Sequence, residues 1–201
     1  MSDRQTYDKP VNNYSGGAPL PNNTVDPSVV LGPSSAMVAP VIARNSASGF
    51  PIPPWVEDNR FSAWLVPSAD ANAPEGDYYY QTTFDLTGFK PDTVEIYGRW
   101  ATDNGGTDIL LNDAPTGNAN GTQFPDYTDF VLSAANGQTF LPGVNTLTFL
   151  VNNAPTSNNP TGVRWEFLSA TGERTPEPGA ALLLATAIPT LLRRRHAAHR
   201  R

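Results

Sequence analysis

Between residues 61 and 170, apolar and polar residues alternate with a period of two in several short stretches. This period predicts β-strands that are buried on one face, and the aromatic and β-branched residues at the apolar positions strengthen the prediction. No long helical stripe competes with this pattern before the C-terminal tail. The chain is therefore predicted to be all-β. The sets that share an inward face are Tyr78, Tyr80, Thr82, Phe84 and Leu86; Val94, Ile96, Gly98 and Trp100; Leu147, Phe149 and Val151; and Val163, Trp165 and Phe167.

The four tryptophans divide by their place in this pattern. Trp100 and Trp165 are in phase with apolar residues and are predicted to lie in the core, and Trp64 is also predicted to be buried. Trp55 stands in a loop-rich segment and is the first candidate for an exposed aromatic side chain. Tyr79, on the polar face of its strand, is the second. Exposed aromatic faces with polar neighbours are typical of sugar-binding sites.

Turn residues separate the predicted strands. The 16 glycines and 20 prolines are spread as punctuation, and turns are expected at 88–91, 104–106, 136–137 and 142–143. About eight short strands over ~130 residues favour a β-sandwich. Residues 1–60, rich in Pro, Asn and Ser, are expected to form an irregular N-terminal arm with edge strands of the sandwich, whose core is residues 61–170.

Several segments of the core resemble a known module. They are Thr83-Phe-Asp-Leu-Thr-Gly-Phe89, Gly98-Arg-Trp-Ala-Thr-Asp-Asn104, Ile109-Leu-Leu-Asn112, Thr116-Gly117 and Leu141-Pro-Gly-Val-Asn-Thr-Leu-Thr-Phe-Leu-Val-Asn152. This series is similar to the galactose-binding-like jelly-roll domain, including the non-catalytic sandwich domains attached to glycoside hydrolases. The resemblance implies a jelly-roll β-sandwich. Where those modules close a strand in Asn-Gly, this chain has Asn112-Asp113, and Asp adopts the left-handed conformation less readily than Gly, so a different turn is expected.

The tail, residues 171–201, carries a second resemblance. Pro176, Glu177 and Pro178 precede an apolar segment at 180–192, and the chain ends in a basic stretch at 193–201. This order resembles the PEP-CTERM sorting signal of Gram-negative bacteria. The resemblance implies export, transient retention in the inner membrane and processing by a sorting protease of the exosortase type.

The tail also has a purely physical interpretation. The apolar segment is short against the roughly 20 residues that span a bilayer comfortably, and Pro189 weakens it as a helix. The arginines after it resist translocation, which predicts arrested insertion with the main domain outside. The alternative is a C-terminal amphipathic helix packed on its own domain. The basic stop-transfer residues are Arg193, Arg194, Arg195, Arg200 and Arg201.

Charge and composition narrow the function. The chain has 13 basic and 19 acidic residues; without the five tail arginines, residues 1–192 keep 8 basic residues against 19 acidic ones, a net charge of −11. An acidic domain argues against a nucleic-acid partner. There is no cysteine, and His196 and His199 in the tail are the only histidines, so thiolate and histidine-based chemistry is excluded from residues 1–192.

The carboxylates form no persuasive acid–base pair, and no nucleophile-elbow or phosphate-loop motif is present, so no catalytic residue is assigned and the protein is expected not to be an enzyme. The possible ligand-binding residues are Trp55, Tyr79, Asp103 and Asn104. No cofactor is assigned, but calcium prefers oxygen ligands, and Asp103, Asn104 and Asp108 bracket a Gly-Gly turn, so a calcium site there competes with an ordinary turn.

The leading interpretation is an exported, non-catalytic surface or extracellular-matrix protein that binds or embeds in extracellular polysaccharide. The alternative is a purely structural adhesion or matrix component with no saccharide site. The expected location is the inner membrane transiently, then the cell surface or extracellular matrix of a Gram-negative bacterium. The first residues, Met1–Pro10, contain no apolar signal-peptide core. We explain this by a start codon assigned too far downstream; the alternative is that the tail resembles the sorting signal by accident. The ligand and the oligomeric state are left open.

Overall fold

The computed structural model describes residues 4–6, 14–15, 18–19, 21, 24–32, 40–43, 49, 52–57, 59–154 and 158–176. Its strands are β1 (Arg4–Thr6), β2 (Tyr14–Ser15), β3 (Ala18–Pro19), β4 (Val30–Gly32), β5 (Val41–Ala43), β6 (Trp64–Val66), β7 (Asn72–Ala73), β8 (Gly76–Asp85), β9 (Glu95–Asp103), β10 (Gly105–Leu111), β11 (Ala114–Pro115), β12 (Thr128–Ser133), β13 (Val144–Asn153), β14 (Asn159–Pro160) and β15 (Gly162–Glu173). Two short 3-10 helices, η2 (Pro91–Thr93) and η3 (Ala134–Asn136), lie between them. The all-β prediction is confirmed for this part of the chain.

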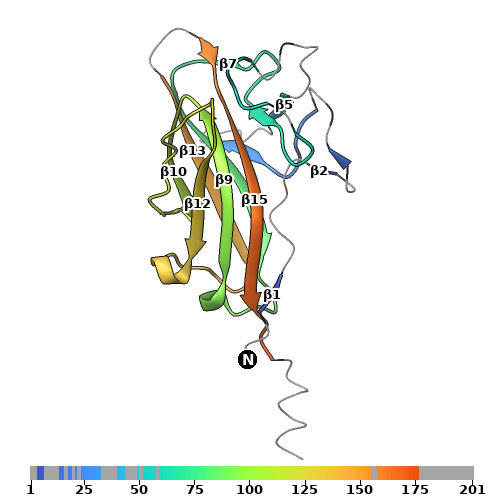
Figure 1. The fold of residues 1–201 in the computed structure, drawn as a ribbon, viewed down its shortest axis with the longest axis vertical. Coiled ribbons are helices and arrows are strands. Elements are labelled where there is room, and N and C mark those ends of the chain that lie inside the picture. The colour runs from blue at the N-terminus through green and yellow to red at the C-terminus, as the bar shows by residue number, and fades with distance from the viewer. Residues whose placement is uncertain are drawn as a thin grey trace, which may run out of the picture.

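The long strands form two antiparallel sheets that pack face to face (Figure 1). Sheet I has the order β12-β9-β15-β6-β5, with β1 beside β15, and sheet II has the order β11-β10-β13-β8-β4. The chain changes sheet at nearly every step, because β8, β10 and β13 belong to sheet II whereas β9, β12 and β15 belong to sheet I. A β-sandwich is the result.

The core lies between the sheets and is built from the predicted inward faces. On β8, Tyr80, Thr82 and Phe84 are buried, whereas Thr83 and Asp85, on the other face, are exposed. The other three alternating stretches bury their apolar sets in the same way. Burial of apolar surface is the main driving force for folding, so this alternation determines which face of each strand turns inward.

Aromatic rings fill the centre of the core. Phe149 of β13 stacks on Trp165 of β15, with ring centroids 4.3 Å apart and planes 4° from parallel. The Phe149 ring also lies 5.7 Å from Trp100 of β9. Trp100 is 0% exposed and Trp165 is 2% exposed, which confirms that both are core residues.

The Asn112-Asp113 turn was expected to differ from an Asn-Gly turn, but the structure shows no such difference. It joins β10 to β11 as a two-residue hairpin, and both residues have positive φ, 52° and 65°. This is the requirement of a type I′ turn. The Asn112 side chain holds the conformation, because its Nδ2 donates to Asn145 Oδ1 at 2.9 Å and its Oδ1 accepts from the Thr146 backbone N–H at 2.9 Å.

The outer face of sheet I is covered in part, and here the prediction for one strand is wrong. Arg164 and Glu166 alternate with the apolar residues of β15, so a strand buried on one face would expose both, yet both are buried. A second apolar cluster covers this face, formed by Trp55, Trp64, Val66, Ala71 and Ala101 with Ile52, Val56, Phe124 and Tyr127 packed against it. Segment 52–57 and the loop before β12 therefore bury one end of β15 on both faces.

The sorting tail lies largely outside the described residues. Of its motif the structure describes Pro176, and Glu177, Pro178, the apolar segment at 180–192 and the basic stretch at 193–201 are not described. The predicted C-terminal apolar helix therefore also lies outside this part of the chain. Among the described residues, no helix has the length and apolar character needed to cross a membrane.

Replacing Trp100 with alanine should lower the free energy of unfolding by about 3–5 kcal/mol, the usual cost of removing a large buried aromatic side chain. Chemical denaturation followed by intrinsic fluorescence measures this loss. Thr83→Ala, at an exposed position of β8, is the control and should change stability by less than ~0.5 kcal/mol. A loss below ~1 kcal/mol for Trp100→Ala would contradict the central place of this ring.

Candidate functional site

Trp55 is not an exposed aromatic side chain, and this expectation is corrected by the structure. The residue is 5% exposed. Its ring packs on Trp64 with centroids 4.3 Å apart, and its Nε1–H donates to Asp103 Oδ2 at 2.7 Å. Because an indole buries a large apolar area and needs one hydrogen-bond acceptor, the second apolar cluster satisfies Trp55 better than solvent does.

Asp103 is the acceptor of this bond and is itself buried, with 6% exposure. Its second oxygen, Oδ1, is buried without a hydrogen-bond partner. Burial raises the pKa of the Asp103 carboxyl group to about 6, although the hydrogen bond from Trp55 acts in the opposite direction. Two of the predicted ligand-binding residues are thus brought together, but as an interior pair rather than as an open binding face.

The side chains of Asn104 and Asp108 both accept hydrogen bonds from backbone N–H groups. Asn104 Oδ1 accepts from the Ala154 N–H at 2.8 Å, and Asp108 Oδ1 accepts from the N–H groups of Ile109 and Asn118 at 2.7 and 2.9 Å. The described part of the chain holds no group of three or more His, Cys, Asp or Glu side chains arranged for a metal ion.

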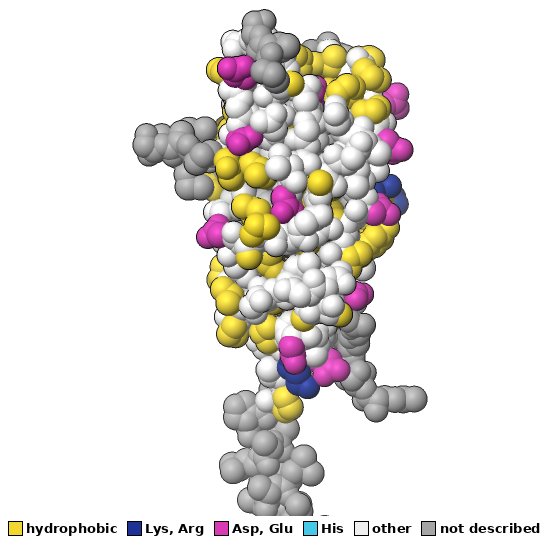
Figure 2. Space-filling view, turned by 90° about the vertical axis from the view of Figure 1, so that its left-hand side faces the viewer, with side chains coloured by type: hydrophobic (Ala, Val, Ile, Leu, Met, Phe, Trp, Pro, Cys, Tyr) yellow, Lys and Arg dark blue, Asp and Glu magenta, His cyan; other side chains and the backbone are white. Residues whose placement is uncertain are grey.

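Tyr79 is half-buried on the outer face of β8, between Gly32 of β4 and Leu150 of β13. It is the predicted aromatic candidate that keeps a partly open ring. Figure 2 shows one side of the molecule, where acidic side chains are scattered among apolar and neutral ones and basic side chains are few.

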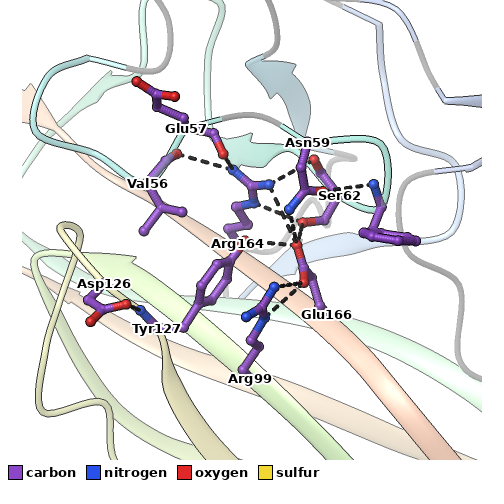
Figure 3. Close-up of polar contacts among 10 residues, drawn as sticks. Val56, Glu57, Asn59, Ser62, Arg99, Asp126, Tyr127, Arg164 and Glu166 are labelled. Carbon is purple, nitrogen blue, oxygen red and sulfur yellow. Dashed lines mark hydrogen bonds and ion pairs between the residues drawn. The ribbon is translucent and has the colours of Figure 1, made fainter.

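A polar cluster that the sequence analysis missed lies beside the second apolar cluster (Figure 3). Its centre is the Glu166 carboxylate on β15. Glu166 Oε2 accepts two hydrogen bonds from the Arg99 guanidinium, from Nε at 2.9 Å and Nη2 at 2.7 Å. Glu166 Oε1 accepts from Asn59 Nδ2 at 2.7 Å, from the Ser62 hydroxyl at 2.8 Å and from the Tyr127 hydroxyl at 2.9 Å.

Arg164 ties the same cluster to the segment that covers it. Its side chain is 0% exposed, and its Nη2 lies 3.6 Å from Glu166 Oε1. Nη1 donates to the carbonyl oxygens of Val56 at 3.1 Å and Glu57 at 2.6 Å, and Nε donates to the Ser62 hydroxyl at 2.8 Å. The guanidinium therefore binds a loop backbone that has no strand ladder of its own.

The electrostatics of the cluster keep Glu166 ionised. Burial by itself would raise the pKa of Glu166, but hydrogen bonds from Asn59, Ser62, Arg99 and Tyr127 outweigh it and lower the pKa to about 2. Burial raises the pKa of Tyr127 to about 12, so its hydroxyl is a donor at neutral pH. The Arg99 guanidinium also lies over the Tyr127 ring, 4.3 Å from its centroid, which is a cation–π contact.

This arrangement suits a structural role, in which the cluster holds the covering segment on β15, rather than proton transfer. A general base must have an oxygen within reach of a substrate proton, yet both Glu166 oxygens already accept bonds from protein donors. A signal for the cluster was present in the sequence: Arg164 and Glu166 are opposite charges two residues apart, and so share one face of a strand whose other face is aromatic. What the sequence did not indicate was that this face is covered.

A shallow pocket of about 250 Å³ lies elsewhere, where η2, β9 and β15 approach η3. Asp92, Glu95 and Glu173 contribute carboxylates to its lining, and Glu173 is paired with Lys90 at 2.9 Å. The pocket is polar and acidic.

No protein-family model, no curated protein and no solved structure matches this chain.

Replacing Glu166 with glutamine should lower the free energy of unfolding by about 3–5 kcal/mol at pH 7, because it leaves two guanidinium groups without their carboxylate. The pKa of Glu166 is depressed in the folded state, so its contribution is present above the ordinary value of 4.5 and is lost as pH falls toward 2. The difference in free energy of unfolding between parent and variant should therefore be constant above about pH 5 and become smaller below it. Urea unfolding at several pH values measures it, with exposed Glu75→Gln as the control. An equal gap at pH 7 and pH 3 would refute the role given to the Glu166 charge.

Replacing Asp103 with asparagine should change the free energy of unfolding with a pH dependence opposite to that of the Glu166 variant. The pKa of Asp103 is raised from 3.8 to about 6 in the folded state, so the parent protein loses stability as pH rises from 4 to 6. The loss should be up to about 3 kcal/mol. Asparagine keeps an acceptor for the Trp55 N–H but has no charge, so the variant should match the parent near pH 4 and exceed it at pH 7. Urea unfolding at both pH values checks this; a variant with the same pH dependence as the parent would exclude Asp103 as the source.

Proposed function

We propose that the chain is an exported, non-catalytic surface or extracellular-matrix protein with a C-terminal sorting signal. The observation that carries the proposal is the order of the tail: Pro176-Glu177-Pro178, the apolar segment at 180–192, then the arginines of 193–201. An exosortase-type protease is the partner that this order implies, with the inner membrane as a transient location and the surface or matrix of a Gram-negative bacterium as the destination.

The position of the motif relative to the fold supports removal of the tail. β15 ends at Glu173, and every strand pairing described in the two sheets lies before Pro176. Cleavage at the motif would therefore leave the sheet ladders intact. A sorting signal that is removed must not contribute a strand to the domain that it delivers.

We further propose that the sandwich is of the galactose-binding-like jelly-roll kind. Support comes from the repeated change of sheet between β8 and β15, together with the sequence segments that resemble that module. A fold of this kind does not determine the ligand, because function depends on sites added to the fold.

The non-catalytic character is supported by how the buried carboxylates are used. Glu166 is surrounded by donors from its own chain, and Asp103 is paired with Trp55. Residues 1–192 contain neither histidine nor cysteine, so the Ser–His and Cys–His nucleophile–base pairs cannot form among them.

The burial of Trp55 favours the structural alternative over a saccharide site formed by the predicted residues. Of those four, Tyr79 keeps a half-buried ring, and a single partly exposed ring is a small platform for a sugar. Titration with neutral oligosaccharides, followed by NMR at Tyr79, decides between the two: a shift at millimolar ligand supports polysaccharide binding, and its absence supports a purely structural matrix component.

Protein recovered from outside the cells of the native host should lack the C-terminal tail. The expected mass corresponds to a chain that ends near Pro176–Pro178, because the sorting protease removes the apolar and basic segments. Intact-mass spectrometry measures this directly, with the same protein from whole-cell extracts as the reference. A secreted species that still ends in Arg201 would contradict the proposal.

A further inference from the structure

The strand β12 is an open edge of sheet I. It pairs with β9 along all six residues, and the described chain places no strand on its other side (Figure 1). The strands at the other three ends of the two sheets are shorter, since β4 and β5 have three residues each and β11 has two. Long open edges are the places where sheets recruit another strand.

Hydrogen bonds at the end of β12 show which of its backbone groups point to the open side. The Ser133 N–H donates to Gln138 Oε1 at 2.9 Å, and the Ser133 carbonyl accepts from the Gln138 N–H at 3.4 Å, so both groups point away from β9. Successive residues of a strand point these groups to opposite sides. Asp129 and Val131 therefore also turn their N–H and C=O groups to the open edge.

The opposite strand gives the same orientation. On β9, the Trp100 carbonyl accepts from Asn120 Nδ2 at 2.7 Å, and the Thr102 N–H donates to the Gln123 carbonyl at 3.4 Å. Asn120 and Gln123 belong to the loop that leads into β12. The backbone N–H and C=O groups of the even-numbered residues of β9 therefore point toward β12. Since Phe130 is paired with Gly98, Phe130 makes the ladder bonds and Asp129 does not.

Edge strands are usually protected by charge, proline or a bulge, and β12 has little of this protection. Its pairing with β9 is regular over its whole length. Val131 is 37% exposed on the outer face. The one charged side chain, Asp129, is held by the Tyr97 hydroxyl, which donates to Asp129 Oδ2 at 2.7 Å. Within the described chain, the open-edge N–H and C=O groups of Asp129 and Val131 have no hydrogen-bond partner outside the sheet.

We propose that β12 pairs antiparallel with β12 of a second copy of this chain, about a two-fold axis at Phe130. This axis sets Asp129 opposite Val131 of the second copy, and Val131 opposite Asp129 of the second copy. All four open-edge backbone groups of each strand are then paired. The two copies of sheet I join into one continuous sheet, and the interface is isologous, as in most homodimers.

The register follows from the groups that are free. An axis at Val131 would set Ser133 opposite Asp129 of the second copy, and the Ser133 backbone is already bonded to Gln138. An axis between two residues would set inward side chains opposite outward ones, which the buried core forbids. The axis at Phe130 avoids both problems, and it also keeps the two Asp129 carboxylates from lying directly opposite each other.

Charge predicts how this pairing depends on salt. The full chain carries a net charge of −6 and its residues 1–192 carry −11, so two copies repel each other at low ionic strength. Added salt screens this repulsion. Association should therefore become tighter as salt is raised, in contrast to an interface held by ion pairs.

The test is sedimentation equilibrium of the full-length chain at 0.05 and 0.5 M salt, combined with amide hydrogen exchange at low and high protein concentration. We expect a monomer–dimer equilibrium that is tighter at high salt. The Asp129 and Val131 amides should become protected as the dimer forms, whereas the Phe130 and Leu132 amides, already in the β9 ladder, should not change. A monomer at all concentrations up to ~1 mM would overturn the proposal.

Three substitutions at one position test the register. Val131→Pro removes an N–H that faces the open edge, which a folded sheet tolerates, and should abolish the dimer. Val131→Asp sets like charges opposite each other and should weaken dimerisation about tenfold. Val131→Lys sets a cation opposite Asp129 of the second copy and should keep or tighten the dimer, most clearly at low salt. Val25→Asp, at another exposed valine, is the matched control and should behave as the parent.

Each outcome of these experiments either supports or excludes the pairing of β12 about Phe130. If Val131→Pro fails to fold, the opposite effects of Asp and Lys still report the register. Equal effects of Asp and Lys, or parent-like association of both, would exclude the pairing about Phe130. Protection of other amides in place of Asp129 and Val131 would place the interface elsewhere. The proposal does not depend on the sorting tail, because tail removal is read by mass and leaves β12 unchanged.

Discussion

The described fold depends on β15, one end of which is buried on both faces by two different kinds of interaction. Its inner face carries Trp165 and Phe167 into the aromatic core, where non-directional burial supplies the stability. Its outer face carries Arg164 and Glu166, whose charges require partners wherever water is excluded. The partners come from β9, from the loop before β12 and from residues 56–57 and 59–62. The strand that completes the sandwich therefore also determines where this segment must lie.

The fold could be predicted from the sequence where one side of a strand faces solvent, because period-two alternation reports a difference between two faces. That is why the inward set of β8 and the core positions of Trp100 and Trp165 were predicted correctly. The alternation does not indicate which other segments cover the outer face of a strand. Arg164 and Glu166 look like solvated residues in the sequence, and the residues that satisfy them, such as Asn59 and Tyr127, are separated from Glu166 by 107 and 39 positions. Contacts at such distances along the chain leave no periodic pattern.

Trp55 and Asp103 show the same limit at a single pair. Trp55 stands among prolines in a segment that reads as a loop, and the acceptor for its N–H lies 48 positions further along the chain. Asp103 stands at the end of β9, beside a turn, which is where solvated carboxylates are common. Neither local context indicates burial. Only the covering of the outer face of sheet I by segment 52–57 turns two candidates for ligand binding into an interior hydrogen bond, with one carboxylate oxygen left unpaired.

The outer face of sheet I is covered near one end of β15 and uncovered near β12, and this difference bears on the proposed assembly. At one end, the second apolar cluster and the Glu166 network hold covering segments against β15, so the outer face of β15 is buried there. Toward β12 the covering stops, and Val131 is exposed. The matrix role and the strand pairing proposed above would need a surface through which copies join without unfolding, and an edge strand can supply one because its hydrogen-bonding groups already have the spacing of the next strand. The internal ion network and the open edge are thus complementary: the first closes the interior of the sheet against water, and the second leaves one side on which the sheet can grow.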